Sequence, residues 1–396
     1  MHTLAHAIEV CATATVAVSM AYCLLVLVAA LSFRVYAARY RQLPEFAANS
    51  FPGVSMLKPV KGLDEGMVEA FRSHCLQTYA GEYELIFGAG SVDDPAIAAV
   101  NRLIAEFPER PIRWMICTQR LGTNGKVSNL IQMLPHARHD FLLINDSDIR
   151  VTPNYLERVM RQFLAPGKQP VGMVTALYRG RIARWTLGAA LEALGIATDF
   201  HAGVLMARLL EGGIHFGLGS TLCMRREALA AAGGLEELVD HLGDDYEMGA
   251  RISAAGYAIR LATEVVETSV PAYSLAGFWS HQLRWARTVR DSRRWGYAGL
   301  LVTHTLPLAV VNVLASGASF LSLWLLGLAF FLRLGTAMQV GSGVLRDRQV
   351  LANLWLLPLR DLAGFLVWIW GFAGNTIEWR GERFVLRNGR LEKASE

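Results

Sequence analysis

Charged residues are scarce in this chain. Asp, Glu, Lys and Arg make up only 18% of its 396 residues, whereas hydrophobic residues make up 53%. Soluble domains carry about 25% charged residues, so this composition excludes a disordered chain and argues against a wholly soluble protein. The length also exceeds that of one ordinary domain and predicts a large domain with appended parts.

The chain also lacks a strong net charge and any paired arrangement of cysteines. A formal net charge of +4 is too small to indicate nucleic-acid binding, and we interpret it as a bias next to membrane segments. The five cysteines form no CxxC pair and no cluster with histidine. This pattern supports neither a disulfide framework nor a structural zinc site. A membrane-tethered globular protein fits these absences.

The first long uncharged run covers residues 10–33. At about 1.5 Å per residue it forms roughly 36 Å of helix, enough to cross a bilayer. A cleaved signal peptide is the alternative, but no basic residue precedes the run and it is longer than a typical signal core. Arg34, Arg39 and Arg41 follow it, which predicts a retained anchor with its downstream side in the cytoplasm.

The second uncharged run covers residues 296–332 and is too long for a single span. It predicts two helices joined near residues 312–319, where Ser316 and Gly317 favour a turn.

A third apolar stretch, residues 350–377, is interrupted by Arg360 and Asp361. Adjacent charges at membrane depth are costly unless they are buried against protein, so a re-entrant or interfacial segment is an alternative to a span. The basic residues from Arg380 onward predict a cytoplasmic tail.

Between these regions, short apolar strands alternate with helical patterns. This alternation predicts an α/β fold with a mostly parallel, doubly wound sheet and helices on both faces. Ligands of such sheets bind beyond the carboxyl ends of the strands. The expected strands are residues 54–58, 83–88, 112–117 and 141–145, and the expected helices are residues 64–77, 95–107 and 126–134.

The chain accordingly divides into five predicted parts. They are an N-terminal anchor (1–33), a juxtamembrane linker (34–51), a catalytic-type α/β domain (52–290), C-terminal transmembrane or re-entrant helices (291–377) and a cytoplasmic tail (378–396).

Asp93 and Asp94 follow the second expected strand and precede Pro95. An Asp before Pro is an ordinary helix cap, and a capping carboxylate at a strand end can also meet a nucleotide. Both roles stay open for Asp94.

Two carboxylates at a spacing of two follow the strand expected at residues 141–145. Asp146 and Asp148 lie beyond the tip of this central strand. Such a pair can bind Mg²⁺ or Mn²⁺, which prefer oxygen ligands, and the metal can neutralise a departing diphosphate. The alternative is a solvated turn.

Asp244 and Asp245 precede another helical pattern. A carboxylate here can act as a general base toward an attacking hydroxyl, and a helix cap is the alternative. Gly217 and Gly219, further upstream, allow either a close approach to a ligand or a structural turn. Lys126 can offer a point charge to a phosphate, or it is a solvated helix lysine.

His281, Arg284 and Trp285 lie in an amphipathic stretch just before the second uncharged run. Arg supplies donors that match a diphosphate, and Trp supplies a flat apolar face, so the stretch suits a nucleotide-sugar pocket. The arginines that follow it are expected to face anionic lipid.

The order of these motifs resembles the ceramide glucosyltransferase group of inverting GT-A glycosyltransferases over nearly the whole chain. That family is described by three aspartates followed by a (Q/R)xxRW motif. The residues that carry the resemblance are 54–62, 93–96, 122–130, 146–150, 244–246 and 284–285.

The resemblance implies a role for each candidate residue. Asp94, Asp146 and Asp245 take the three aspartate places, and Asp245 is the general base. The implied metal ligands for Mg²⁺ or Mn²⁺ are Asp146 and Asp148, although Asp148 completes a DxD that animal members lack in full. His281 stands at the first motif position in place of Gln or Arg. The implied nucleotide-sugar-binding residues are Lys58, Asp94, Lys126, Asp146, His281, Arg284 and Trp285.

The expected activity is transfer of one hexose from a UDP-sugar to a primary hydroxyl of a membrane lipid, most directly from UDP-glucose to ceramide. One alternative is a hopanoid glycosyltransferase that uses UDP-N-acetylglucosamine and bacteriohopanetetrol, and others are a processive polysaccharide synthase and a non-catalytic nucleotide-binding receptor. Residues 182–210 are expected either to receive the lipid at the interface or to form a buried amphipathic helix. The expected location is a multi-pass membrane protein (inner membrane if bacterial) with its catalytic domain in the cytoplasm and no nucleic-acid partner.

Overall fold

The computed structural model describes residues 2–40, 43–47, 50–379 and 382–393. Parts of the expected linker (34–51, including Arg41) and of the expected tail (378–396, including Arg380) lie outside the described residues. The chain forms two compact units. We call them the helical unit (Met1–Val35, Arg184–Gly212 and Ala272–Asn388) and the sheet unit (Tyr36–Ala183, Gly213–Pro271 and Gly389–Glu396).

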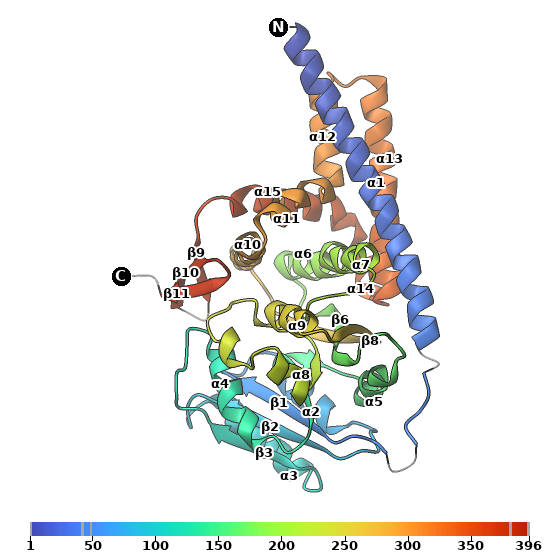
Figure 1. Cartoon of the computed structure of the whole chain (residues 1–396). Helices are drawn as coiled ribbons and strands as arrows, with labels where there is room; N and C mark the ends of the chain where they lie inside the picture. Colours follow the sequence, from blue (N-terminus) through green and yellow to red (C-terminus); the bar gives the residue numbers. More distant parts are fainter. Residues whose placement is uncertain (1, 41–42, 48–49, 380–381, 394–396) are drawn as a thin grey trace. The chain divides into compact units, whose positions relative to one another are not determined.

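Within the described residues, the sheet unit is built on an eight-stranded sheet (Figure 1). Its strands are β1 (Val54–Val60), β2 (Tyr83–Ala89), β3 (Ile112–Ile116), β4 (Phe141–Ile144), β5 (Ile149–Arg150), β6 (Val171–Ile182), β7 (Leu222–Arg225) and β8 (Ala258–Val270). Their order in the sheet is β3-β2-β1-β4-β7-β6-β8-β5. β11 (Arg390–Lys393) lies outside this sheet.

The sheet is mostly parallel, as the sequence predicts. β3, β2, β1 and β4 run parallel to one another, and β6 runs parallel to β8. β7 is antiparallel to both of its neighbours, and β5 is antiparallel to β8. The α/β fold class is therefore confirmed. β5, β6, β7 and β8 were not predicted from the sequence.

Helices pack on the sheet because its central strands are buried on both faces. All seven residues of β1 and of β2 are buried, which a sheet allows only when both faces are covered. The helices of this unit are α2 (Met67–Cys75), α3 (Pro95–Glu106), α4 (Gly125–Met133), α5 (Tyr155–Arg161), α8 (Arg226–Ala231) and α9 (Asp244–Ala254), with short η1 (Leu134–His136), η2 (Gln162–Leu164) and η4 (Glu236–Leu238).

The helical unit consists mainly of apolar helices. Two of its segments, η3 and η6, are π-helices, in which the turn is wider than in an α-helix. Its elements are α1 (His2–Tyr40, which ends in the sheet unit), α6 (Leu187–Gly195), η3 (Ile196–Phe200), α7 (His201–Leu210), α10 (Leu275–Ser292), α11 (Arg294–Gly299), η5 (Leu300–Thr303), α12 (Thr305–Ala315), α13 (Phe320–Ala337), η6 (Met338–Val344), α14 (Arg348–Asn353), η7 (Leu354–Leu356), α15 (Leu357–Gly371), β9 (Thr376–Trp379) and β10 (Glu382–Arg387).

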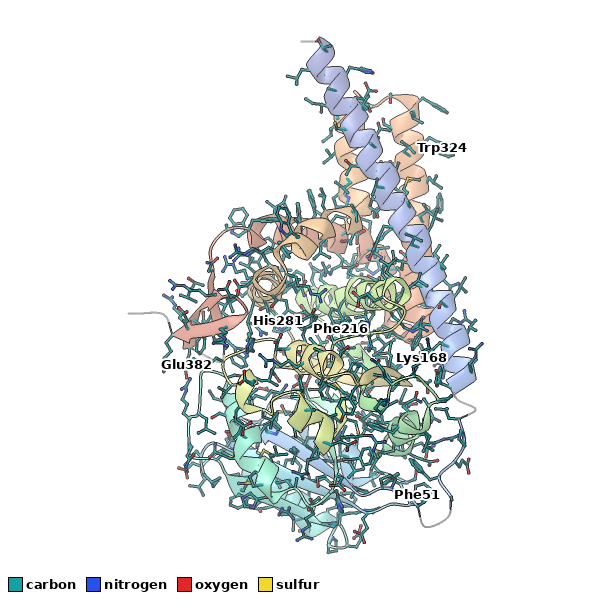
Figure 2. All side chains as sticks on the ribbon, in the orientation of Figure 1. Phe51, Lys168, Phe216, His281, Trp324 and Glu382 are labelled. Atoms are coloured by element: carbon teal, nitrogen blue, oxygen red, sulfur yellow. The ribbon has the colours of Figure 1, made fainter. Side chains whose placement is uncertain are left out.

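Several of these helices are long and apolar enough to cross a membrane. Among the described residues they number four, at Thr3–Tyr40, Leu187–Leu210, Phe320–Val344 and Arg348–Gly371. A fifth candidate is the pair Arg294–Thr303 and Thr305–Ala315, which is bent by 68°. Trp324 of α13 is exposed and points away from the neighbouring helices (Figure 2), as expected for a side chain that faces lipid.

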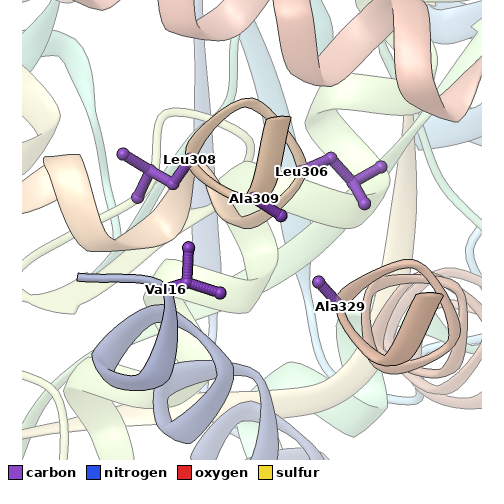
Figure 3. Close-up of a cluster of buried hydrophobic side chains, with 5 residues drawn as sticks. All are labelled: Val16, Leu306, Leu308, Ala309 and Ala329. Atoms are coloured by element: carbon purple, nitrogen blue, oxygen red, sulfur yellow. The ribbon is translucent and has the colours of Figure 1, made fainter. Parts of the chain in front are cut away.

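Helices α1, α12 and α13 pack through a small apolar cluster (Figure 3). Its buried members are Val16, Leu306, Leu308, Ala309 and Ala329. Small residues such as the two alanines let helices approach closely where no hydrophobic effect drives their association. The turn between α12 and α13 falls at the predicted position.

Polar side chains also join α1 to α12. The Ser19 hydroxyl donates to Thr305 Oγ1 at 2.7 Å, and the Thr13 hydroxyl donates to Asn312 Oδ1 at 2.9 Å. Polar side chains of this kind find partners on neighbouring helices because lipid offers none.

The charges that interrupt the third apolar stretch are buried and paired. Arg333 Nε donates to both carboxylate oxygens of Asp361, at 3.1 and 2.9 Å. Arg333 also pairs with Asp199 of η3, whose second oxygen lies 3.1 Å from Arg360 Nη2. Two arginines and two aspartates thus neutralise one another inside the helical unit. We name these four residues the buried charge cluster.

We predict that Asp361→Asn destabilises the protein by about 3 kcal/mol, because it leaves buried positive charge in excess. The measurement is the apparent melting temperature of the purified protein in detergent. Arg102→Gln, at an exposed position on α3, is the control and should change stability by less than about 0.5 kcal/mol. Equal melting temperatures for the two variants would contradict a stabilising role for the buried charge cluster.

Candidate active site

The acidic residues singled out in the sequence follow the carboxyl ends of neighbouring strands. Asp94 comes after β2, and Asp146 comes two residues after the last residue of β4. β1 pairs in parallel with both strands, so these ends face the same edge of the sheet. This edge is where an open α/β sheet binds its ligands.

Lys126 joins two of the carboxylates at this edge. Its Nζ lies 2.8 Å from Asp146 Oδ1 and 3.0 Å from Asp244 Oδ2. Burial alone would lower the pKa of Lys126, but the carboxylates of Asp146, Asp244 and Asp245 outweigh burial and raise it. The ammonium is therefore held in its charged form and neutralises repulsion between the acids.

Asn124 places Lys126 at the start of α4. Its Oδ1 accepts the backbone N–H groups of Lys126 and Val127 at 3.0 and 3.2 Å, which caps the helix. Its Nδ2 donates to Asp244 Oδ1 at 3.3 Å. One buried amide thus fixes both the lysine and its second acidic partner.

Asp146 and Asp245 lie on the two sides of Gly219. The Gly219 N–H donates to Asp245 Oδ2 at 2.6 Å, and the Gly219 carbonyl accepts the Asp146 N–H at 3.1 Å. A Cβ at position 219 would lie 2.7 Å from Asp146 Oδ2 and 3.2 Å from Asp245 Oδ2. Glycine is therefore the residue that lets both carboxylates approach the same point.

The environment of Asp245 favours a proton acceptor. Burial raises its pKa most, the neighbouring Asp244 raises it further, and Lys126 opposes them, giving a pKa of about 6. The Tyr246 N–H donates to its Oδ1 at 2.8 Å and fixes the carboxylate. A carboxylate with a raised pKa holds a proton better than an ordinary Asp.

Asp94 is a helix cap, as one of its two predicted roles requires. Its Oδ1 accepts the Ala96 N–H at 2.9 Å. Both of its oxygens also accept the N–H of Gly62, at 3.1 and 3.0 Å. Asp94 thus ties the loop after β1 to the start of α3, and its contact with a nucleotide stays a prediction.

Asp146 and Asp148 can supply the protein's share of a divalent metal site. Among the residues that the structure describes, no three His, Cys, Asp or Glu side chains gather as a preformed metal site. Mg²⁺, however, is commonly held by one or two carboxylates, with substrate phosphates and water completing the shell. The Asp146 side chain is 44% exposed, so a ligand can reach it. The residues therefore fit a metal that binds together with a diphosphate.

Asp148 contacts β8 through its carboxylate. The Thr268 hydroxyl donates to Asp148 Oδ2. Burial raises the pKa of Asp148, and the neighbouring Asp146 raises it further. A bound cation would offset this repulsion between the two acids.

Lys58 lies inside the sheet unit and is fully buried. Its Nζ is 3.0 Å from His74 Nε2 and 3.2 Å from Asn145 Oδ1. Burial lowers the pKa of Lys58 to about 7, and the charges of Asp146 and Asp148 oppose this shift. Lys58 thus lies inside β1, two residues before its last residue, and its charge acts on Asp146 and Asp148. Its contact with a nucleotide-sugar stays a prediction.

The remaining predicted residues belong to α10 in the helical unit. The His281 ring stacks on Tyr273 at a centroid distance of 5.4 Å and lies 5.5 Å from the Trp285 ring. Trp285 also meets the edge of Phe200 at 5.6 Å. Arg284 is half-buried on the same helix. The rings of His281, Tyr273, Trp285 and Phe200 thus form a connected aromatic cluster. The role of His281, Arg284 and Trp285 in donor binding stays a prediction.

Asn124 and Glu192 were not singled out from the sequence. Asn124 directly precedes a helical pattern, so its capping role was open to prediction. No role for Asp244 distinct from that of Asp245 was predicted. Glu192 is a charged residue in the apolar segment 182–210, and intramembrane charges of this kind mark functional positions.

The mostly parallel sheet and the helices that cover it form a GT-A fold. A mannosyltransferase from Pyrobaculum calidifontis, solved with GDP-Man and Mn²⁺, has a similar fold with a TM-score of 0.51 and 18% sequence identity. The match covers 90% of this chain and 99% of that chain. Within this class, the chain belongs to glycosyl transferase family 21, whose family model matches residues 11–392.

Relatives in sequence agree with this assignment. Ceramide glucosyltransferase 3 of Caenorhabditis elegans is 24% identical over 380 residues, which cover 93% of this chain and 80% of the relative. A beta-monoglucosyldiacylglycerol synthase of Synechocystis sp. is 21% identical over 237 residues, which cover 60% of this chain and 47% of that protein. The family resemblance inferred from the motifs is therefore confirmed, and the protein is a glycosyltransferase.

We predict that Gly219→Ala lowers the rate of glycosyl transfer at least about a hundredfold, because the added Cβ drives Asp146 and Asp245 apart. Gly213→Ala is the matched control, since a Cβ at position 213 meets nothing within 4 Å. The measurement is the initial rate of both variants at equal protein concentration, with circular dichroism to establish folding. A folded Gly219→Ala variant with the rate of the control would refute the close approach of the two acids.

Proposed function

We propose that this protein transfers one hexose, with inversion, from a UDP-sugar to a primary hydroxyl of a membrane lipid. The acceptor that its relatives favour is ceramide, and the donor is then UDP-glucose. The observation that carries the proposal is the convergence of Asp146, Asp244 and Asp245 on Lys126 at the ligand-binding edge of a GT-A sheet. Membership in glycosyl transferase family 21 supports it.

In this mechanism Asp245 is the general base. The lipid hydroxyl loses its proton to the Asp245 carboxylate while its oxygen attacks the anomeric carbon from the face opposite the diphosphate. The bond from that carbon to the diphosphate oxygen breaks, UDP departs, and the product is a β-linked monoglycosyl lipid. The raised pKa of Asp245, about 6, supports this role because a base works best near the operating pH.

The donor diphosphate would lie on the Lys126 side of the cluster. Asp146 and Asp148 would hold Mg²⁺ or Mn²⁺, which neutralises charge on the leaving diphosphate. Lys126 would give its ammonium to a phosphate oxygen, and Asp94 would meet the nucleoside. The similar fold solved with Mn²⁺ is in line with this metal use.

The helical unit gives the enzyme access to an acceptor that stays in the bilayer. Its apolar helices are long enough to span, and Leu187–Leu210 falls in the segment that we expect to receive the lipid. We propose that the sheet unit faces the cytoplasm, because Arg34 and Arg39 follow the uncharged run at residues 10–33.

The activity is tested with purified full-length protein, UDP-glucose or UDP-N-acetylglucosamine, and vesicles that contain ceramide, diacylglycerol or bacteriohopanetetrol. We expect a single added hexose on one lipid, identified by mass spectrometry, and glucosylceramide as the product. A different lipid product would replace the acceptor in this proposal. A ladder of longer products would indicate a processive synthase instead, and absence of transfer in every combination would overturn the proposed function.

Asp245→Asn should keep UDP-sugar binding and lose transfer by at least about a thousandfold, because an amide cannot accept the proton. In the unchanged protein, transfer should fall as the pH drops below about 6, where Asp245 becomes protonated. Binding is measured by calorimetry and transfer by UDP release across pH 5 to pH 8. Near-normal turnover of Asp245→Asn would eliminate Asp245 as the base.

Removal of divalent metal should abolish transfer. We expect EDTA to stop UDP release and added Mg²⁺ or Mn²⁺ to restore it. The reason is that the metal supplies the positive charge that stabilises the leaving diphosphate. Full activity in EDTA would discard the metal role of Asp146 and Asp148.

A further inference from the structure

Glu192 is a buried carboxylate in an otherwise apolar helix. Only 2% of its side chain is exposed, and every other residue of α6 from Gly188 to Gly195 is apolar and buried. Burying a carboxylate is costly unless hydrogen bonds or charges compensate it. The contacts of Glu192 therefore have to explain its presence.

Both oxygens of Glu192 contact consecutive residues of α10. Oε1 lies 3.0 Å from His281 Nδ1, and Oε2 accepts from Gln282 Nε2 at 2.9 Å. Gln282 Oε1 in turn accepts from Nη2 of Arg360, a member of the buried charge cluster, at 3.1 Å. Helices α6 and α10 lie side by side in Figure 1, and His281 is labelled in Figure 2.

This arrangement fixes the protonation pattern of the His281 ring. A carboxylate only accepts hydrogen bonds, so Nδ1 of His281 carries a proton toward Glu192, and in the tautomer that this contact selects the lone pair is on Nε2. The His281 side chain is 20% exposed whereas Glu192 is buried, so a ligand can reach the ring but not the carboxylate. The Tyr273 ring stacks on the His281 ring, and the Trp285 ring packs against it at a tilt.

We propose that Glu192 is a positioning residue that holds His281 with Nε2 as a hydrogen-bond acceptor for a substrate hydroxyl. This inference rests on the proposed function. His281 stands where the motif has Gln or Arg. With its lone pair on Nε2 the ring offers an acceptor, as the amide oxygen of Gln does and the guanidinium of Arg does not. The hydroxyl belongs either to the sugar of the donor or to the lipid acceptor.

The test is a cycle of four full-length proteins: wild type, Glu192→Gln, His281→Gln and the double variant. Glu192→Gln keeps the side-chain volume, but its amide donates toward Nδ1, which moves the ring proton to Nε2 and makes Nε2 a donor. We expect transfer to fall about tenfold to a hundredfold in the wild-type background. In the His281→Gln background, where no ring remains to reorient, Glu192→Gln should change transfer by less than about twofold.

The Michaelis constants separate the two sources of the hydroxyl. A higher KM for the UDP-sugar in Glu192→Gln assigns the hydroxyl to the donor, and a higher KM for the lipid assigns it to the acceptor. Either result supports the proposal. An unchanged rate in Glu192→Gln, or an equal loss in both backgrounds, overturns it, because a merely structural carboxylate costs the same with either residue at position 281.

Glu84→Gln is the matched control for loss of a buried carboxylate. Glu84 of β2 is 1% exposed and accepts from the Ser55 hydroxyl at 2.7 Å and from the Arg138 N–H at 2.8 Å. It should lower the melting temperature and have the same effect on transfer in both backgrounds. If the effect of Glu84→Gln on transfer also depended on the residue at position 281, the dependence would not be specific to Glu192. That result would overturn the proposal.

Melting temperatures of the same four proteins test the contact without substrate. We expect a non-additive cycle, because each substitution alone alters the same Glu192–His281 contact. If no protein transfers sugar to any lipid, the proposed function fails, while a non-additive melting cycle still supports the pairing. An additive melting cycle overturns the pairing even if transfer is observed.

Discussion

The candidate active site depends on one ammonium group placed among carboxylates. Lys126 lies within 3.0 Å of Asp146 and of Asp244, and the charge of Asp245 also acts on it. Without this cation, the acids would repel one another or take up protons. With it, the proposed metal ligand Asp146 has a counter-charge, and the pKa of Asp245 is about 6. Positive charge at this point is therefore the condition on which both proposed roles depend.

In the helical unit, buried charges are also compensated by opposite charges. Arg333, Arg360, Asp199 and Asp361 neutralise one another among apolar helices. Gln282 connects Arg360 to Glu192. Burial of each charge beside a partner lets a chain with few charged residues carry polar groups at membrane depth. In both units, the buried charges described here have an opposite charge or a hydrogen-bonding group within reach.

Much of the fold was accessible from the sequence because its signals are local. The alternation of apolar strands and helical patterns located β1 to β4 to within about two residues, and the turn near Ser316 separated α12 from α13 as expected. Asp94 and Asn124 are caps that a reader of the sequence can recognise. β6, β7 and β8 were not predicted, and the parallel register of β6 on β8 follows only from the fold. The pairing of Glu192 with His281 was hidden for the same reason, since only the fold brings α6 against α10.

The most direct test of this account is the affinity for the donor after loss of the lysine. In the presence of Mg²⁺, we expect Lys126→Met to bind UDP-sugar roughly tenfold or more weakly than the unchanged protein, because a charge-assisted contact is lost. Lys168→Met, at an exposed position, should bind as the unchanged protein does. Equal donor affinity in the two lysine variants would contradict the central place given to Lys126.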